Sequence, residues 1–89
     1  MVEQEVEIVN RLGLHARAAA KLVQMAAQYD CEIALERNGE QVDAKSILGI
    51  LMLAAAQGAK LTVRCEGSDE AAALAAITGL LAERFGEER

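Results

Sequence analysis

The sequence predicts a single α+β domain over residues 1–89, an open-faced β-sandwich in which three helices cover one face of a four-stranded antiparallel sheet. Three observations predict this fold class. Four short segments alternate apolar and polar residues, as half-buried strands do. Three other segments have helical composition and spacing. The segments follow one another in the order βαββαβα, which is typical of helices packed on one face of an antiparallel sheet whose other face stays in water.

The first strand is expected over residues 2–9, because glutamates alternate there with apolar residues. Gly13 then marks a turn. An alanine-rich helix is expected over residues 16–28, where apolar residues recur at the spacing of a buried helix face. Residues 31–37 alternate again and predict the second strand.

A hairpin and a short helix should follow. Asn38-Gly39 is a strong signal for a type I′ turn, which returns the chain through a short strand over residues 40–43. Ser46 is a good N-cap residue, so the second helix is expected near residues 47–54.

The last strand and helix complete the pattern. Residues 60–66 alternate and predict the fourth strand. Ser68 is expected to cap the last helix, and the carboxylates of Asp69 and Glu70 suit the positive end of its dipole. We expect that helix to continue to about Phe85.

The second helix carries more apolar residues than one face can bury. Every residue from Ile47 to Ala56 except Gly49 is apolar, whereas a helix lying on a sheet buries only a stripe. An apolar patch should therefore remain near the surface, where it would suit protein docking. The candidate members of this patch are Ile47, Leu48, Leu51 and Met52.

Composition excludes several functions. The net charge is −5, and the chain has one Tyr, one Phe and no Trp, so neither a nucleic-acid partner nor an anionic membrane surface is expected. The N-terminus is acidic, unlike a signal peptide, and no apolar run reaches the roughly 18 residues that span a bilayer. We expect a cytoplasmic protein without membrane insertion.

The cysteines do not indicate a metal site. Cys31 and Cys65 lack the spacing of metal ligands, and a single histidine cannot complete a zinc site. Both cysteines lie in phase with apolar neighbours, which favours buried, reduced thiols. No metal or cofactor is expected.

The one position that indicates chemistry is His15, the only histidine of the chain. It lies where the Gly13 turn meets a helix, and the start of a helix offers free backbone N–H groups and a positive dipole end. Arg17 follows two residues later, and residues 11–29 contain no carboxylate. This pattern would suit an exposed site at which a histidine carries a phosphoryl group, although a lone histidine before a helix is more often a surface or capping residue.

This sequence resembles a known family over essentially its whole length. Residues 13–17, Gly-Leu-His-Ala-Arg, resemble the phosphohistidine motif of HPr, the phosphocarrier of the bacterial sugar phosphotransferase system. Residues 42–51, together with Asn38-Gly39 before them, resemble the regulatory serine segment of that family, at the family's distance from the histidine. Residues 57–59 and 67–71 extend the match.

The resemblance implies a carrier with a covalent phosphohistidine rather than an independent enzyme. His15 would accept a phosphoryl group on Nδ1 from phospho-enzyme I and pass it to a histidine of an enzyme IIA domain, with Arg17 as the mobile cation. Ser46 would be the target of HPr kinase/phosphorylase. The protein would act as a monomer without a cofactor. The residues that would contact partners are Ala16, Ala20, Gln24, Ile47, Leu48 and Leu51.

One departure from the family pattern leaves the pathway open. Ala18 stands where the family usually has proline, and it adds a backbone donor near the expected phosphate. The nitrogen-regulatory phosphotransferase branch shares the fold and the histidine, although residues 45–49 favour a carrier under serine-kinase control.

Two other classes remain as alternatives. An acylphosphatase-like enzyme would need an arginine in a glycine-rich phosphate loop, and no glycine-rich loop surrounds Arg17. A regulatory binding module without phosphorelay would not need His15 and Arg17 together.

Overall fold

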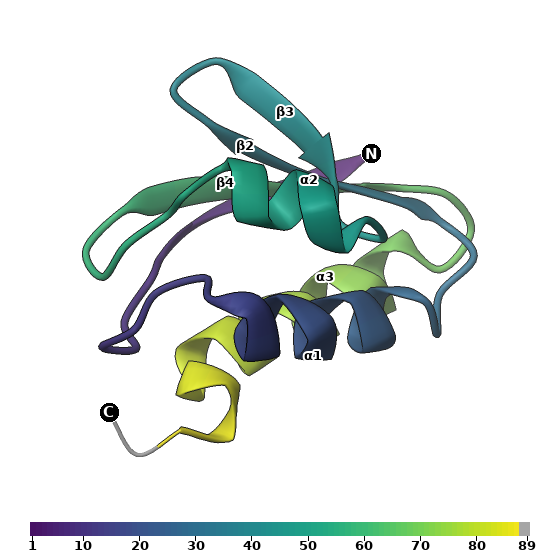
Figure 1. Cartoon of the computed structure of the whole chain (residues 1–89). Coiled ribbons are helices and arrows are strands. Elements are labelled where there is room, and N and C mark those ends of the chain that lie inside the picture. Colours follow the sequence, from purple (N-terminus) through teal and green to yellow (C-terminus); the bar gives the residue numbers. More distant parts are fainter. Residues whose placement is uncertain (88–89) are drawn as a thin grey trace.

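The computed structural model describes residues 1–87, and its elements follow the predicted order (Figure 1). The strands and helices are β1 (Val2–Glu7), α1 (Ala16–Ala26), β2 (Glu32–Arg37), β3 (Glu40–Asp43), α2 (Ile47–Met52), β4 (Lys60–Glu66) and α3 (Glu70–Ala82), and a short 3₁₀ helix η1 (Arg84–Gly86) follows them. The strands form one antiparallel sheet in the order β1-β4-β2-β3. The predicted fold class is confirmed.

The helices lie on one face of this sheet (Figure 1). Helix α3 packs against β1 and β4, and α1 contacts both α2 and α3. Apolar side chains of the inward strand positions and of the helices fill the space between the two layers. The largest of these core side chains include Leu22, Leu35, Ile50, Leu61, Val63, Ile77, Leu81 and Phe85.

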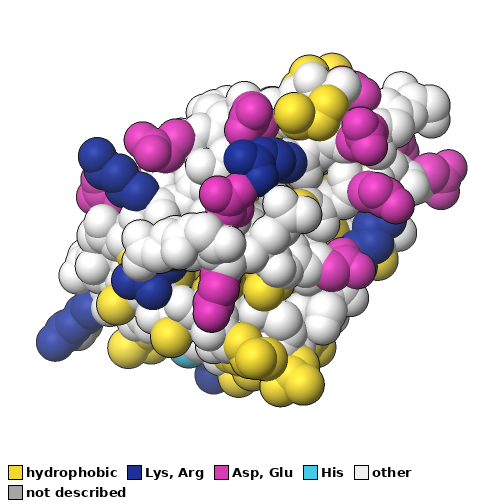
Figure 2. Space-filling model, turned by 90° about the horizontal axis from the view of Figure 1, so that it is seen from above, with side chains coloured by type: hydrophobic (Ala, Val, Ile, Leu, Met, Phe, Trp, Pro, Cys, Tyr) yellow, Lys and Arg dark blue, Asp and Glu magenta, His cyan; other side chains and the backbone are white. Residues whose placement is uncertain are grey.

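The outer face of the sheet is acidic and exposed. Figure 2 shows acidic side chains spread over this face, whereas hydrophobic side chains gather along one edge of the view. Arg64 lies on β4, between β1 and β2. Its Nε atom forms an ion pair with the Glu3 carboxylate of β1 at 3.1 Å, and its guanidinium forms a second ion pair with Glu36 of β2. One guanidinium thus offsets part of the repulsion among the glutamates of this face.

The predicted hairpin between β2 and β3 is confirmed. Asn38 and Gly39 have φ angles of 52° and 85°, and a type I′ turn requires positive φ at both central residues. Arg37 and Glu40 pair directly on either side of the turn.

The predicted N-cap of α3 was wrong. The helix begins at Glu70, so Asp69 rather than Ser68 holds the cap position, and the Asp69 side chain makes no capping bond. Its carboxylate instead accepts the backbone N–H groups of Asp30 and Cys31, at 2.8 and 2.9 Å. A residue expected to act within its own helix therefore ties that helix to the segment before β2.

Other predictions needed smaller changes. β1, α1 and α2 each end two residues earlier than the sequence suggested, at Glu7, Ala26 and Met52.

Cys31 and Cys65 are free and buried, as predicted. Burial raises the pKa of both thiols, that of Cys31 to about 11. No helix in the described residues is long and apolar enough to cross a membrane.

Candidate functional site

The loop before α1 is fixed by Gly13. Its φ is +67°, and a Cβ at this position would lie 2.5 Å from the carbonyl oxygen of Ala55. The next residue, Leu14, donates its backbone N–H to that same carbonyl at 2.9 Å. The loop thus lies directly against the segment that follows α2, and only glycine fits this approach without strain.

This loop delivers His15 to the N-cap position of α1. The backbone of His15 is extended, with φ −78° and ψ 175°, and its carbonyl accepts the N–H of Ala19 at 2.8 Å. The His15 side chain makes no capping bond, and the first turn of α1 contains no acidic residue. The first N–H groups of the helix therefore remain available to an anion, as the sequence predicted.

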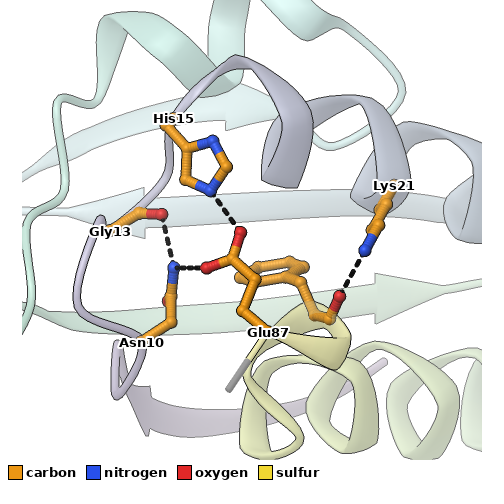
Figure 3. A network of polar contacts seen from close by, with 6 residues as sticks. Asn10, Gly13, His15, Lys21 and Glu87 are labelled. Carbon is orange, nitrogen blue, oxygen red and sulfur yellow. Dashed lines mark hydrogen bonds and ion pairs between the residues drawn. The ribbon is translucent and has the colours of Figure 1, made fainter. Parts of the chain in front are cut away.

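The imidazole itself is held by a carboxylate from the other end of the chain. Nε2 of His15 is hydrogen-bonded to Oε2 of Glu87 (Figure 3). The amide nitrogen of Asn10 donates to Oε1 of Glu87 at 3.0 Å and to the Gly13 carbonyl at 2.8 Å. Asn10 is fully buried, and the His15 side chain is only 24% exposed. The imidazole is therefore half-buried rather than fully exposed, and the carboxylate that contacts it comes from outside residues 11–29.

Glu87 reaches the site because the chain turns back after α3. Arg84 and Phe85 both have φ of 57°, so the chain leaves the helical path there, and η1 packs against α1 and α3. Phe85 is buried in the core, and Nζ of Lys21 donates to its carbonyl oxygen at 2.6 Å (Figure 3). The one sequence signal for this turn was an aromatic residue, Phe85, followed by Gly86, beyond an alanine- and leucine-rich helix.

Glu87 is ionised at neutral pH. Partial burial raises the pKa of its carboxyl, but hydrogen bonds from His15 and Asn10, with attraction to His15 and Lys21, outweigh this effect. The net result is a pKa below the ordinary glutamate value. The site therefore pairs the histidine with a carboxylate that only accepts hydrogen bonds.

Arg17 lies on the first turn of α1 and is exposed. Its guanidinium forms no ion pair with any described residue. Ala18, the residue in the usual proline position, is fully buried, so its methyl group packs in the core. The structure thus leaves the Arg17 side chain free to move toward an anion bound beside His15.

Ser46 is the N-cap of α2, as predicted. Its hydroxyl oxygen accepts the N–H of Gly49 at 3.2 Å. The preceding turn is held by Asp43, whose carboxylate accepts the N–H of Lys45 at 2.8 Å. Ser46 is half-buried, so its hydroxyl reaches the surface at the start of the helix.

The predicted apolar patch on α2 is confirmed. Ile47, Leu48, Leu51 and Met52 are 44, 69, 36 and 69% exposed, whereas Ile50 of the same helix is fully buried. On the neighbouring α1, Ala16 and Gln24 are exposed and Ala20 is half-buried. The candidate partner-binding residues therefore lie on two helices that contact each other.

Known proteins are similar to this chain over nearly its whole length. The family model described as the PTS HPr component phosphorylation site matches residues 2–83. The phosphocarrier protein HPr of Cupriavidus necator is 49% identical over 87 residues, which cover 98% of both chains. That of Pseudomonas aeruginosa is 49% identical over 84 residues and 93% of both chains.

Solved structures agree with the sequence matches. A crystal structure of HPr from Thermoanaerobacter tengcongensis superposes over 100% of both chains with a TM-score of 0.97 and 43% identity. An HPr from Bacillus anthracis matches with a TM-score of 0.85 and 41% identity, over 88% of this chain and 93% of that one. The chain therefore belongs to the HPr family, the phosphocarrier proteins of the phosphotransferase system.

Proposed function

We propose that His15 accepts a phosphoryl group from phospho-enzyme I and transfers it to a histidine of an enzyme IIA domain. The observation that carries this proposal is the placement of the ring at the start of α1, beside uncapped N–H groups. In the first step, Nδ1 of His15 attacks phosphorus and the P–N bond of the donor breaks. The second step reverses these roles, so the carrier is regenerated.

The phosphoryl oxygens would be stabilised by the protein without a metal ion. The first N–H groups of α1 supply hydrogen-bond donors and the positive end of a helix dipole. Arg17 supplies a cation that forms no ion pair with any carboxylate of the described residues. At an exposed helix start the dipole contributes only about 0.3–1 kcal/mol, which suits a carrier that must release the group again.

The apolar patch of α2 and the neighbouring residues of α1 would form the docking surface for both partners. Residues 11–29 and 44–65 contain six basic residues and no acidic one, although the net charge is −5, and one of the six, Arg64, is paired with Glu3 and Glu36 on the outer face of the sheet. An apolar partner surface with an acidic rim would fit this region. The protein would work as a cytoplasmic monomer and bind no nucleic acid.

Ser46 would regulate the carrier as a target of HPr kinase/phosphorylase. Its hydroxyl lies at the start of the helix that carries the docking patch. A phosphate there would meet the acidic rim of a docking partner and slow association. This segment favours the sugar pathway under serine-kinase control, with the nitrogen-regulatory branch as the alternative.

Incubation with enzyme I and phosphoenolpyruvate tests the proposed function. The chain should acquire one acid-labile, alkali-stable phosphate, and His15→Ala should abolish it without unfolding the protein. Phosphate on the His15→Ala variant would place the acceptor elsewhere. A wild-type chain that never acquires phosphate would favour a regulatory binding module, and catalytic release of phosphate from a small acyl phosphate would favour the acylphosphatase-like alternative.

A further inference from the structure

We propose that Glu87 is a positioning residue for the phosphoryl transfer, a role that rests on the proposed function of His15. The carboxylate holds the ring proton on Nε2, leaves the lone pair of Nδ1 free to attack phosphorus, and stabilises the positive charge that the ring gains in the reaction. The family model matches residues 2–83, so Glu87 lies beyond the matched segment. The proposed role belongs to the C-terminal segment of this chain rather than to the motif around His15.

The hydrogen-bond pattern determines which ring nitrogen carries the proton. An ionised carboxylate has no proton to donate, and the Asn10 amide already donates to its other oxygen at 3.0 Å. The hydrogen in the contact between Glu87 and Nε2 must therefore come from the ring. A neutral imidazole has one N–H, so Nδ1 carries the lone pair. Figure 3 shows this second nitrogen on the side of the ring turned away from Glu87.

The same contact matters when the phosphoryl group arrives. As the new bond forms between Nδ1 and phosphorus and the donor's P–N bond breaks, the ring becomes a phosphoimidazolium that still holds its Nε2 proton. Its positive charge then lies beside the Glu87 carboxylate. When the group leaves, the bonding electrons return to Nδ1 and the ring becomes neutral, with the Nε2 proton in place. Glu87 takes no proton at any stage, as with the carboxylate behind the histidine of a serine-protease triad.

The structure holds Glu87 firmly enough for this role. Its side chain is 16% exposed, and it contacts a fully buried amide, that of Asn10. Lys21 fixes the Phe85 carbonyl two residues earlier, and the buried Phe85 ring anchors η1. Glu87 is thus attached to the core through the Asn10 amide and through η1, and it differs from a member of a surface ion pair, whose side chains remain mobile.

Three variants test the proposal. Glu87→Gln keeps the size of the side chain and removes its charge, Glu87→Ala removes the contact, and Glu83→Gln is the control. Glu83 is an exposed carboxylate of the same C-terminal region, and its side chain makes no hydrogen bond or ion pair with a described residue. Phosphoryl transfer from phospho-enzyme I should slow about tenfold or more in Glu87→Gln, the loss expected for a hydrogen bond to a charged group. It should be unchanged in Glu83→Gln.

A spectroscopic measurement separates positioning from folding. Long-range ¹H–¹⁵N spectra of the unphosphorylated wild type, with the ring neutral, should show a protonated Nε2 and an unprotonated Nδ1. In Glu87→Ala both ring signals should move toward the average of the two tautomers, while the backbone amide spectrum of the core stays in place. A proton on Nδ1 in the wild type, or unchanged ring signals in Glu87→Ala, would overturn the proposal.

The outcomes distinguish this inference from the proposed function. If the wild type is phosphorylated at His15 and Glu87→Gln transfers at the wild-type rate, the role of Glu87 is refuted and the carrier function stands. If the wild type accepts no phosphate, the carrier function fails and the inference fails with it.

Discussion

The ammonium group of Lys21 donates a hydrogen bond to the backbone carbonyl of Phe85 at 2.6 Å, so the middle of α1 holds the chain segment that leads to Glu87. The helix that begins at His15 thus also positions the carboxylate that contacts His15. This arrangement makes the geometry of the site depend on a residue that touches neither the imidazole nor the carboxylate.

Lys21→Met should loosen the C-terminal segment. We expect the free energy of unfolding to fall by about 1–2 kcal/mol, because a buried carbonyl loses a charged donor. The ring ¹⁵N signals of His15 should shift in the same direction as in Glu87→Ala. Lys60→Met is the matched control, since Lys60 is exposed and makes no ion pair in the part of the chain that the structure describes. Equal effects of the two substitutions would contradict the anchoring role.

The ion pair should contribute a pH-dependent stability. The folded-state pKa of Glu87 is depressed, so its contribution is present above the unfolded value of about 4.3 and is lost as the pH falls through the lower folded value. In urea unfolding below pH 5, the stability advantage of the wild type over Glu87→Gln should shrink as the pH falls. An advantage that stayed constant with pH would show that folding does not lower the pKa of the Glu87 carboxyl.

Substitution of two glycines by alanine should change the free energy of unfolding in opposite directions. Gly13→Ala should lower the free energy of unfolding by about 2 kcal/mol or more, since a Cβ there meets the Ala55 carbonyl at a positive φ. Gly79→Ala should raise it by up to about 1 kcal/mol, because Gly79 lies inside α3 and no atom of the described residues lies within 4 Å of the added methyl group. Thermal or urea unfolding measures both. A tolerated Gly13→Ala would mean that the loop before His15 can adopt another path.

Two substitutions in α2 distinguish its exposed docking patch from its buried core face. Leu48→Glu should weaken binding of enzyme I strongly while changing stability by about 0.5 kcal/mol or less, because Leu48 is 69% exposed. Ile50→Ala should instead lower stability by about 2–4 kcal/mol, since Ile50 is fully buried. Calorimetric titration with enzyme I and urea unfolding test the pair. If a folded Leu48→Glu variant bound enzyme I as tightly as the wild type does, the docking surface would have to lie elsewhere.

Ser46→Asp should slow phosphoryl transfer to His15 without unfolding the protein. Aspartate is also a good N-cap residue, so its carboxylate can accept the Gly49 N–H in place of the hydroxyl and keep the melting temperature at or slightly above that of the wild type. Ser46→Ala is the control, expected to lose about 1 kcal/mol of stability and to transfer normally. Transfer by Ser46→Asp at the wild-type rate would argue against regulation through this residue.

The features that the sequence predicted correctly depend on neighbouring residues. The turn at Asn38-Gly39 follows from the left-handed conformations that these two residues tolerate, and the cap at Ser46 involves a bond across only three residues. The exposure of Leu48 followed from counting more apolar residues than a single helix face can bury.

The features that were missed depend on residues far apart in the chain. Glu87 lies 72 positions from His15, and Asp69 lies 38 positions from Cys31. Local composition gives no signal for either contact, because each partner has a satisfactory role in its own segment. The cap at Ser68 was wrong for this reason, since the neighbouring Asp69 bonds another part of the chain.

The strand order β1-β4-β2-β3 has a consequence for the newly made chain on the ribosome. Strand β1 is synthesised first, yet its only partner in the sheet is β4, which ends at Glu66. Until β4 has been synthesised, about three-quarters of the way through translation, the hairpin of β2 and β3 is the only strand pair of the described sheet that can assemble. The N-terminal strand stays unpaired at least until then, and its alternating glutamates favour its solubility during that delay.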